Sequence, residues 1–174
     1  MTTRLRWFDC RFAFDIPVER FPDILERLRG TPVRAVDRVG QLTLSVRIAK
    51  PNGAWSIQEN VGHLLDLEPL WWARWENYRD RQPKLTVADL DNRRTHSANH
   101  NQADPGELLA GFRTERARLV AALEEADPAL WSATALHPRL QQPMRLLDHA
   151  FFVAEHDDHH LATISALLRQ LTQR

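Results

Sequence analysis

The stretch WSIQENVGHL, residues 55–64, predicts the start of a long helix around which the rest of the chain can be arranged. Ser56 and Glu59 have the spacing of a capping box, in which each side chain accepts a hydrogen bond from the backbone N–H of the other. Trp55 precedes them, where a hydrophobic staple residue lies. Apolar residues then recur at helical spacing to about Arg79. They are Ile57, Val61, Leu64, Leu67, Trp71 and Trp75.

The region before this helix contains shorter elements. Residues 5–16 alternate between apolar and polar side chains, which predicts an extended or strand-like segment. Pro17 is expected to open a short helix that Gly30 ends, and Thr31-Pro32 has the form of an N-cap and first-turn proline of another helix. Residues 41–48 alternate again and are a candidate for a second short strand.

Two more helices are predicted after a polar connection. Residues 83–103 are long for a structureless loop, which suggests a function or a short helix. Asp104-Pro105 predicts a helix to about Ala126, and a last helix is expected from near Pro143 to about Leu171. The prediction is therefore an all-α four-helix bundle. It forms a single domain over residues 1–174 with an extended N-terminal segment, residues 1–16, and α+β is the alternative.

The composition excludes several classes of protein. Lys plus Arg and Asp plus Glu both number 23, so the net charge gives no reason to expect a nucleic-acid or membrane partner. Cys10 is the only cysteine, which excludes an intrachain disulfide and a cysteine-based metal site. The N-terminus has no apolar signal core, and no window resembles a membrane span, so a cytoplasmic protein is expected.

The segment EHDDHH, residues 155–160, carries the chemistry. His156 and His160 are four residues apart, so they lie one turn apart on a face that is shared with apolar residues. Two imidazoles at this spacing can bind one metal ion. His63, two turns into the first long helix, is the best candidate for a third ligand from a neighbouring helix. The sequence therefore predicts a three-histidine divalent site with an open coordination position.

Three histidine ligands do not determine which metal binds. Zinc is the commonest metal at such sites, and nickel, iron or manganese also accept nitrogen ligands. A pair of histidines at this spacing can also be a coincidence or a surface pair. Among possible accessory residues, Glu59 is a candidate catalytic carboxylate, although the capping box would engage it. Asp157 lies on the apolar side of the last helix, so its carboxylate needs a partner. This partner is either a ligand histidine that Asp157 orients or an arginine. The remaining histidines are expected on the surface or in loops, and the alternative is that one of them reaches the pocket as a general base. They are His96, His100, His137, His149 and His159.

At these residues the chain resembles the DinB/YfiT-like family of metal-binding four-helix bundles. The resemblance is carried by WSIQENVGHL (55–64) and AEHDDHHL (154–161), with LRGTP (28–32) before them. It implies that His63, His156 and His160 bind a divalent ion, usually zinc or nickel, and that a water completes the shell. It also implies a homodimer. Some members are transferases that use a low-molecular-weight thiol such as bacillithiol, related domains act in mycothiol-dependent isomerases, and others are described as metal-dependent hydrolases.

Two classes of function follow. The first is a metal-dependent enzyme that acts on a small molecule, either as a thiol transferase or as a hydrolase. The metal would then act as a Lewis acid on a bound thiol or on water. The alternative is a non-catalytic metal-binding bundle with a structural or sensing role. The sequence does not separate these classes.

Overall fold

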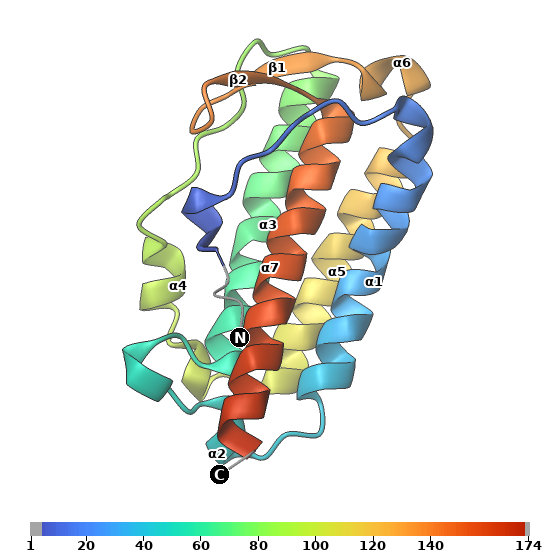
Figure 1. The fold of residues 1–174 in the computed structure, drawn as a ribbon. Helices are drawn as coiled ribbons and strands as arrows, with labels where there is room; N and C mark the ends of the chain where they lie inside the picture. Colours follow the sequence, from blue (N-terminus) through green and yellow to red (C-terminus); the bar gives the residue numbers. More distant parts are fainter. Residues whose placement is uncertain (1–4, 173–174) are drawn as a thin grey trace.

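A computed structural model describes residues 5–172 and places four long helices side by side (Figure 1). The helices are α1 (Phe21–Val39), α3 (Ile57–Arg79), α5 (Pro105–Glu124) and α7 (Leu146–Thr172). Both α1 and α3 pack against α5 and α7, so the helices form a closed bundle. The predicted all-α four-helix bundle is confirmed.

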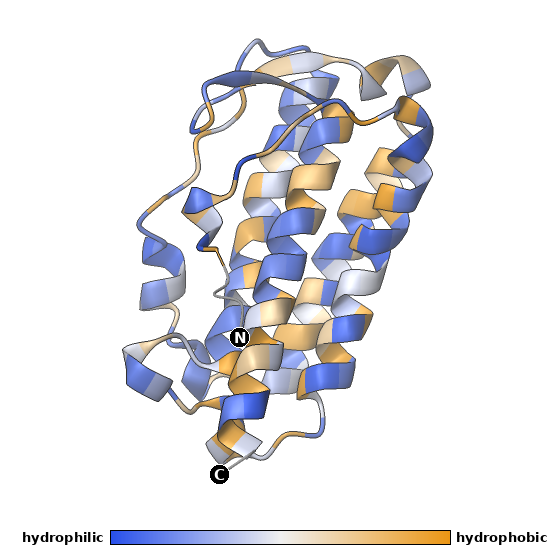
Figure 2. Cartoon of the chain, in the orientation of Figure 1, coloured by the Kyte–Doolittle hydropathy of each residue, from blue (hydrophilic) through white to orange (hydrophobic). Residues whose placement is uncertain are grey.

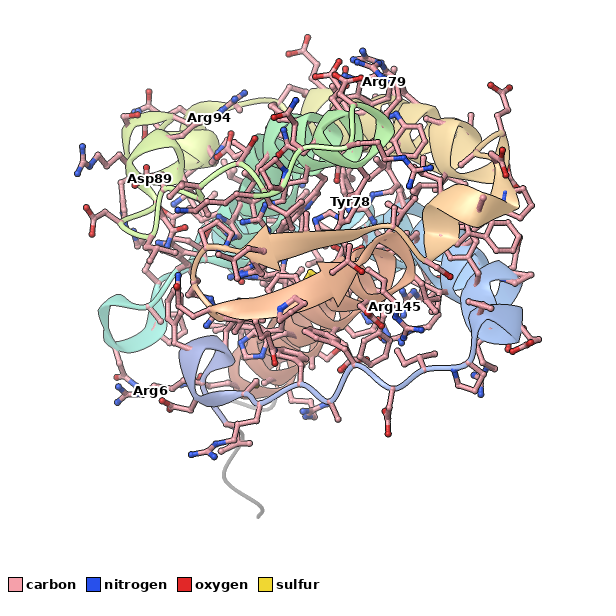
Figure 3. All side chains as sticks on the ribbon, turned by 90° about the horizontal axis from the view of Figure 1, so that it is seen from above. Arg6, Tyr78, Arg79, Asp89, Arg94 and Arg145 are labelled. Atoms are coloured by element: carbon pink, nitrogen blue, oxygen red, sulfur yellow. The ribbon has the colours of Figure 1, made fainter. Side chains whose placement is uncertain are left out.

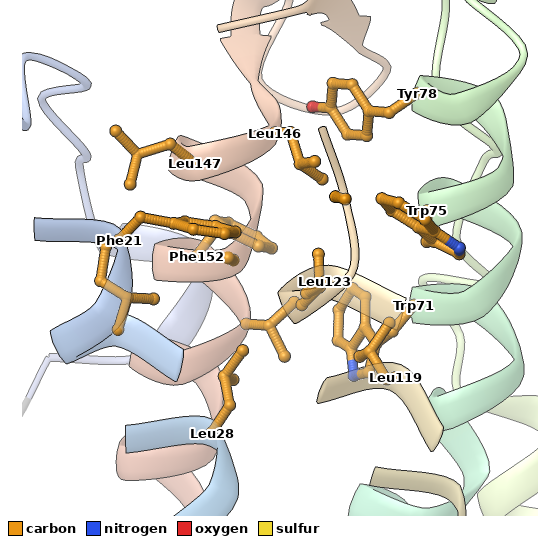
Figure 4. Packing of buried hydrophobic residues seen from close by; sticks show 14 of the residues in the cluster. Phe21, Leu28, Trp71, Trp75, Tyr78, Leu119, Leu123, Leu146, Leu147 and Phe152 are labelled. Carbon is orange, nitrogen blue, oxygen red and sulfur yellow. The ribbon is translucent and has the colours of Figure 1, made fainter. Parts of the chain in front are cut away.

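The bundle is held together by one face of each helix. Figure 2 shows apolar residues in stripes along the long helices, with polar residues on the opposite sides. In the upper half, aromatic and leucine side chains from all four helices meet in one core cluster (Figure 4). Burial of such side chains contributes about 1.5–3 kcal/mol each, so these faces stabilise the bundle more than helix propensity does. Examples are Phe21, Leu28, Trp71, Leu119, Leu123 and Phe152.

The predicted helix starts are present at α3 and α5. The Ser56 side chain accepts a hydrogen bond from the Glu59 N–H, and the Glu59 carboxylate accepts one from the Ser56 N–H at 2.8 Å. Asp104 accepts a hydrogen bond from the Glu107 N–H at 2.9 Å. These local signals could be read from the sequence because each depends on residues three positions apart.

The predicted break at Gly30 is wrong, because α1 continues through Gly30 and Pro32 to Val39. Buried residues on both sides of Gly30 lie on one continuous face of the helix. Packing of this face against α5 and α7 outweighs the low helix propensity of glycine and proline. The buried residues are Leu25, Leu28, Thr31, Pro32, Ala35 and Val39.

The candidate strand at residues 41–48 is wrong, and the start of the last helix predicted near Pro143 is three residues early. Residues 41–48 contain the short helix α2 (Leu44–Arg47), in which the Thr43 carbonyl accepts a hydrogen bond from the Arg47 N–H at 3.0 Å. Pro143 lies in strand β2 (Gln142–Arg145), which pairs with β1 (Thr134–His137) in an antiparallel hairpin. The last helix therefore begins at Leu146. The Asp148 carboxylate fixes this start by accepting a hydrogen bond from the Arg145 N–H at 3.0 Å.

The remaining elements are short and cover one side and the ends of the bundle. They are the helices α4 (Arg93–Ser97) and α6 (Pro128–Trp131) and the 3₁₀ turns η1 (Trp7–Asp9), η2 (Val18–Arg20), η3 (Pro51–Gly53) and η4 (His100–Gln102). Within the described part of the N-terminal segment, residues 5–16 contain η1 and no strand. This segment crosses α7, where the Trp7 ring centroid lies 5.1 Å from that of Phe152 (Figure 1). Across residues 5–172, none of the helices combines the length and the apolar character that crossing a bilayer requires.

Candidate metal centre

Three histidines from α3 and α7 meet inside the bundle. His63, His156 and His160 each offer one ring nitrogen, and these nitrogens all lie within 4.8 Å of one another. The side chains are 4%, 4% and 9% exposed, respectively. The structure therefore brings together the three residues that the sequence singled out.

A chain of hydrogen bonds orients His63. The Thr95 hydroxyl donates to Asp66 Oδ2 at 2.8 Å, so its oxygen is free to accept from the Nδ1–H of His63, 3.0 Å away. Nε2 is then the nitrogen of His63 without a hydrogen. His100 Nε2 lies 2.7 Å from the same Asp66 oxygen. Such partners fix the tautomer and ring direction of a metal-binding histidine.

Gly62 makes room for this support. A Cβ added at Gly62 would lie 2.3 Å from the His100 ring, far inside van der Waals contact. The absence of a side chain at this helical position lets His100 approach α3 closely enough to reach Asp66. Gly62 thus serves close packing rather than an unusual backbone conformation.

His160 is oriented by a residue of α3. Its Nδ1 lies 2.9 Å from the side-chain oxygen of Asn60. The Asn60 amide nitrogen donates to the Ser56 carbonyl at 2.8 Å, which fixes the direction of the amide. The oxygen of Asn60 therefore faces His160 and accepts its Nδ1–H, and Nε2 is again the nitrogen available to a metal.

His156 provides a test of whether the donor set fits a metal ion. Its Nδ1 is buried and has no hydrogen-bond partner within the described chain. A buried polar atom without a partner is costly, and an ion or water in contact with this nitrogen would offset that cost. Three imidazoles match the ligand set of open zinc sites, so the residues fit a divalent cation.

The protonation state of the cluster suits coordination. Burial lowers the pKa of His63 from 6.5 to about 4, although the Asp66 carboxylate opposes the shift. Burial, followed by the charges of the neighbouring histidines, also lowers the pKa of His156 below its usual value. Both rings are therefore neutral at pH 7, which is the form that binds a metal.

A pocket with a volume of about 420 Å³ opens onto the three imidazoles. Its walls are mostly apolar and come from α3, α7, the hairpin, the η1 segment and residues 87–92. Figure 3 places Arg6 and Asp89, two residues of the rim, on the same side of the bundle. Pockets of this size hold small organic molecules. The apolar walls include Trp7, Trp55, Leu67, Trp71 and Phe152.

Asp157 pairs with an arginine and not with a histidine. Arg116 of α5, which is 1% exposed, donates to Asp157 and to Glu68, and so joins α3, α5 and α7. Burial raises the pKa of Glu68 to about 7, and Arg116 opposes this shift. Of the two partners expected for Asp157, the arginine is the one with which it forms hydrogen bonds.

Glu59 is occupied by structural contacts. One oxygen accepts from the Ser56 N–H at 2.8 Å, and the other accepts from Lys50 Nζ, also at 2.8 Å. Its pKa lies below the usual value, since these hydrogen bonds outweigh the effect of burial. Glu59 is absent from the pocket lining.

The expectation that the other histidines lie on the surface or in loops is wrong for His137 and His149, which are buried in β1 and α7. His100 is also buried, but it lies in the η4 turn of the connection before α5. His100, His137 and His149 are 5%, 1% and 3% exposed. His137 and His159 line the pocket, whereas His96 is exposed. The sequence could not place His137 because the hairpin that buries it was not predicted.

Sequence reasoning also missed the residues that orient the ligands. Asn60 and Asp66 lie three residues before and three after His63, so helical spacing puts all three on one side of α3. That spacing was a usable signal. Thr95 and His100 carried no such signal, because α4 and η4 reach the site only through tertiary packing.

The DinB superfamily profile matches residues 22–164. This chain belongs to the DinB superfamily. The matched range begins at the second residue of α1 and ends at Ile164 in α7, and it contains the three histidines. The resemblance deduced from the two motifs is therefore confirmed. No curated protein sequence matches the chain.

Solved structures agree with the superfamily assignment. YfiT from Bacillus subtilis, described as a probable metal-dependent hydrolase with an unusual four-helix bundle topology, superposes with a TM-score of 0.82 at 21% identity over 93% of both chains. A mycothiol-dependent maleylpyruvate isomerase superposes with a TM-score of 0.66 at 14% identity. That match covers 87% of this chain and 62% of the isomerase, and a histidine-to-alanine mutant of the isomerase gives the same values. At these identities the similarity establishes the fold.

Proposed function

We propose that this protein is a metal-dependent S-transferase that joins a low-molecular-weight thiol to a small electrophilic substrate. His63, His156 and His160 would hold a divalent ion, most simply zinc or nickel. When bound, the ion would supply Lewis acidity that keeps a thiol in its reactive thiolate form. The apolar pocket beside the imidazoles would hold the second substrate and exclude water.

The observation that carries the proposal is that three carboxylates close in sequence to the metal-binding histidines accept hydrogen bonds from other residues of the chain. Asp66 accepts hydrogen bonds from Thr95 and His100, Asp157 is paired with Arg116, and Glu59 caps α3. Metal-dependent hydrolases commonly use a base that deprotonates or orients the bound water, whereas a thiolate reacts without one. Among the described residues, Asp89 is the one carboxylate in the pocket lining, and it accepts hydrogen bonds within the turn before α4. A mostly apolar pocket of this kind therefore favours thiol transfer.

A hydrolase is the second candidate, and one observation favours it. His159 lines the pocket, and its ring centroid lies 5.7 Å from that of His160. An imidazole at this position could act as the general base for a water molecule. The description of YfiT as a probable metal-dependent hydrolase agrees with this candidate.

A thiol-conjugation assay separates the candidates. Purified protein would be incubated with bacillithiol, mycothiol or cysteine and an electrophile such as monochlorobimane, with and without a chelator. The proposal predicts thiol-dependent product that a chelator abolishes and added zinc or nickel restores. Chelator-sensitive ester or amide hydrolysis without thiol dependence would support the hydrolase. A bundle that binds metal but is inactive in both assays would support a structural or sensing role.

A further inference from the structure

A second polar group lies in the pocket, apart from the three imidazoles. It consists of Arg74 of α3, His137 at the end of β1, and Arg139 in the hairpin turn. Arg74 is 2% exposed, and within residues 5–172 no carboxylate forms an ion pair with it. Its Nε donates to the Thr86 carbonyl at 3.0 Å, and its Nη1 lies 3.2 Å from His137 Nε2. A buried cation without an anionic partner is costly, so its position requires a reason.

Two N–H groups, one from Leu140 and one from Arg74, approach the ring nitrogens of His137, although the neutral ring can accept only one hydrogen bond. The Leu140 N–H donates to Nδ1 at 3.2 Å, while Arg74 approaches Nε2. Burial, reinforced by the charges of Arg74 and Arg139, lowers the pKa of His137 to about 3, so the ring is neutral at pH 7. A neutral imidazole has one acceptor nitrogen. One of the two N–H groups therefore lacks an acceptor, and an oxygen atom from a ligand would supply it.

Arg139 adds a second cation, and among the residues that the structure describes it also has no acidic partner. Its Nη2 is buried and has no hydrogen bond within the described chain. The guanidinium carbon lies 5.3 Å and 5.8 Å from the ring centroids of Phe8 and Phe152, so the charge is held between aromatic walls. Burial lowers the pKa of Arg74 to about 10; Tyr78 opposes this shift, and the charge of Arg139 adds to it. An anion between these groups would relieve their repulsion.

Asp89, the acidic residue in the pocket lining, is not available to pair with these cations. Asp89 accepts a hydrogen bond from the Arg93 N–H at 2.7 Å and from the Asp91 N–H at 3.2 Å. Both oxygens thus serve the turn before α4.

We propose that Arg74, His137 and Arg139 form a subsite for a carboxylate group of the substrate. The guanidinium fork of an arginine is suited to two-point binding of a carboxylate. The Trp71 ring lies close to both this subsite and the imidazoles, since its centroid is 5.6 Å from the Arg74 Cζ and 5.8 Å from the His156 ring centroid. The ligand is therefore a small organic acid with an apolar or aromatic body whose far end faces the imidazoles.

The assignment of this ligand as a substrate rests on the proposed function, but its binding can be tested separately. Phenylacetate and the uncharged phenylacetamide would be titrated into the purified protein by isothermal calorimetry. The proposal predicts that phenylacetate binds at least tenfold more tightly than the amide. Arg139→Gln should weaken phenylacetate binding at least tenfold and leave the amide unchanged, because a charge-assisted hydrogen bond is lost.

Two further variants control this experiment. Arg79→Gln removes an exposed arginine from the same helix as Arg74 and should leave phenylacetate binding unchanged. Arg74→Lys keeps the charge but lacks the planar guanidinium group that binds a carboxylate at two points, so it should weaken phenylacetate binding. The proposal is overturned if phenylacetate does not bind at millimolar concentration, if the amide binds equally well, or if Arg139→Gln has no effect. If the metal alone bound the carboxylate, Arg139→Gln would have no effect on phenylacetate binding. Carboxylate binding with a negative thiol-conjugation assay would refute the transferase and leave the subsite intact.

Discussion

His160 Nδ1 lies 2.9 Å from the side-chain oxygen of Asn60, 100 residues earlier in the chain. The contact links α7 to the first turn of α3, and the Ser56 carbonyl holds the Asn60 amide in place. The residue that caps α3 therefore also sets the direction of an imidazole in the cluster. This relationship connects the helix start that the sequence predicts to the chemistry of the site.

Asn60→Ala should weaken metal binding about 10- to 100-fold, which is the usual effect of losing a group that orients a ligand histidine. Asn60→Asp keeps an acceptor for the Nδ1–H of His160 and should bind metal more tightly than Asn60→Ala. The affinities would be measured by competition with a chromophoric chelator. Equal affinity in the wild type and Asn60→Ala would show that this hydrogen bond does not support the site.

Gly62→Ala should weaken metal binding by about tenfold or more, because the new Cβ displaces His100 from Asp66 and so disturbs the support of His63. Gly30→Ala is the matched control, since nothing lies within 4 Å of a Cβ added there. That control should leave the metal affinity unchanged and stabilise the protein by about 0.5–1 kcal/mol in urea unfolding. Normal metal affinity in Gly62→Ala would contradict the close approach of His100.

Arg116→Leu should destabilise the protein by about 3–5 kcal/mol, because Glu68 and Asp157 would remain buried without their shared cation. Arg118→Leu, an exposed arginine on the same helix, should change the free energy of unfolding by less than about 1 kcal/mol. Urea unfolding at pH 7 measures both variants. Similar free energies for the two would mean that the buried ion pairs do not hold α3, α5 and α7 together.

His137 should make stability depend on pH. Its pKa is about 3 in the folded protein and near 6.5 when the chain is unfolded, because burial disfavours the charged ring. The unfolded chain binds the proton more readily. The free energy of unfolding is therefore highest above pH 6.5 and falls as the pH drops toward 3.

His137→Gln removes this dependence. The loss of stability between pH 6.5 and 4.5 should be smaller in this variant by about 2 kcal/mol. His96→Gln, which changes an exposed histidine, should follow the wild type. Parallel pH profiles for His137→Gln and the wild type, measured by urea unfolding, would show that the ring titrates normally.

The sequence specified those features that depend on neighbouring residues. The capping residues Ser56 and Asp104 located two helix starts, and the phase of α7 turned His156 and His160 inward. Prediction from the sequence failed where tertiary packing determines the secondary structure. Burial of a continuous face carries α1 through Pro32, and pairing with β1 holds Pro143 in a strand.

The same distinction applies to the site. The three histidines could be predicted because they lie on long, regular helices. Thr95, which contacts His63, and His137 and Arg139, which line the pocket, could not be predicted. They come from a short helix and a hairpin whose positions depend on the whole fold. No local pattern in residues 83–103 or 132–145 specifies where those side chains point.

The most direct test of the central claim is the metal content of the purified protein, measured by inductively coupled plasma mass spectrometry for the wild type, His63→Ala, His156→Ala, His160→Ala and the exposed control His96→Ala. We expect about one divalent ion per chain in the wild type and the control. Each of the other three variants should retain less than about a tenth of that amount, because two imidazoles do not make a tight site. Full metal content in His156→Ala, or none in the wild type after growth with zinc and nickel, would contradict the account.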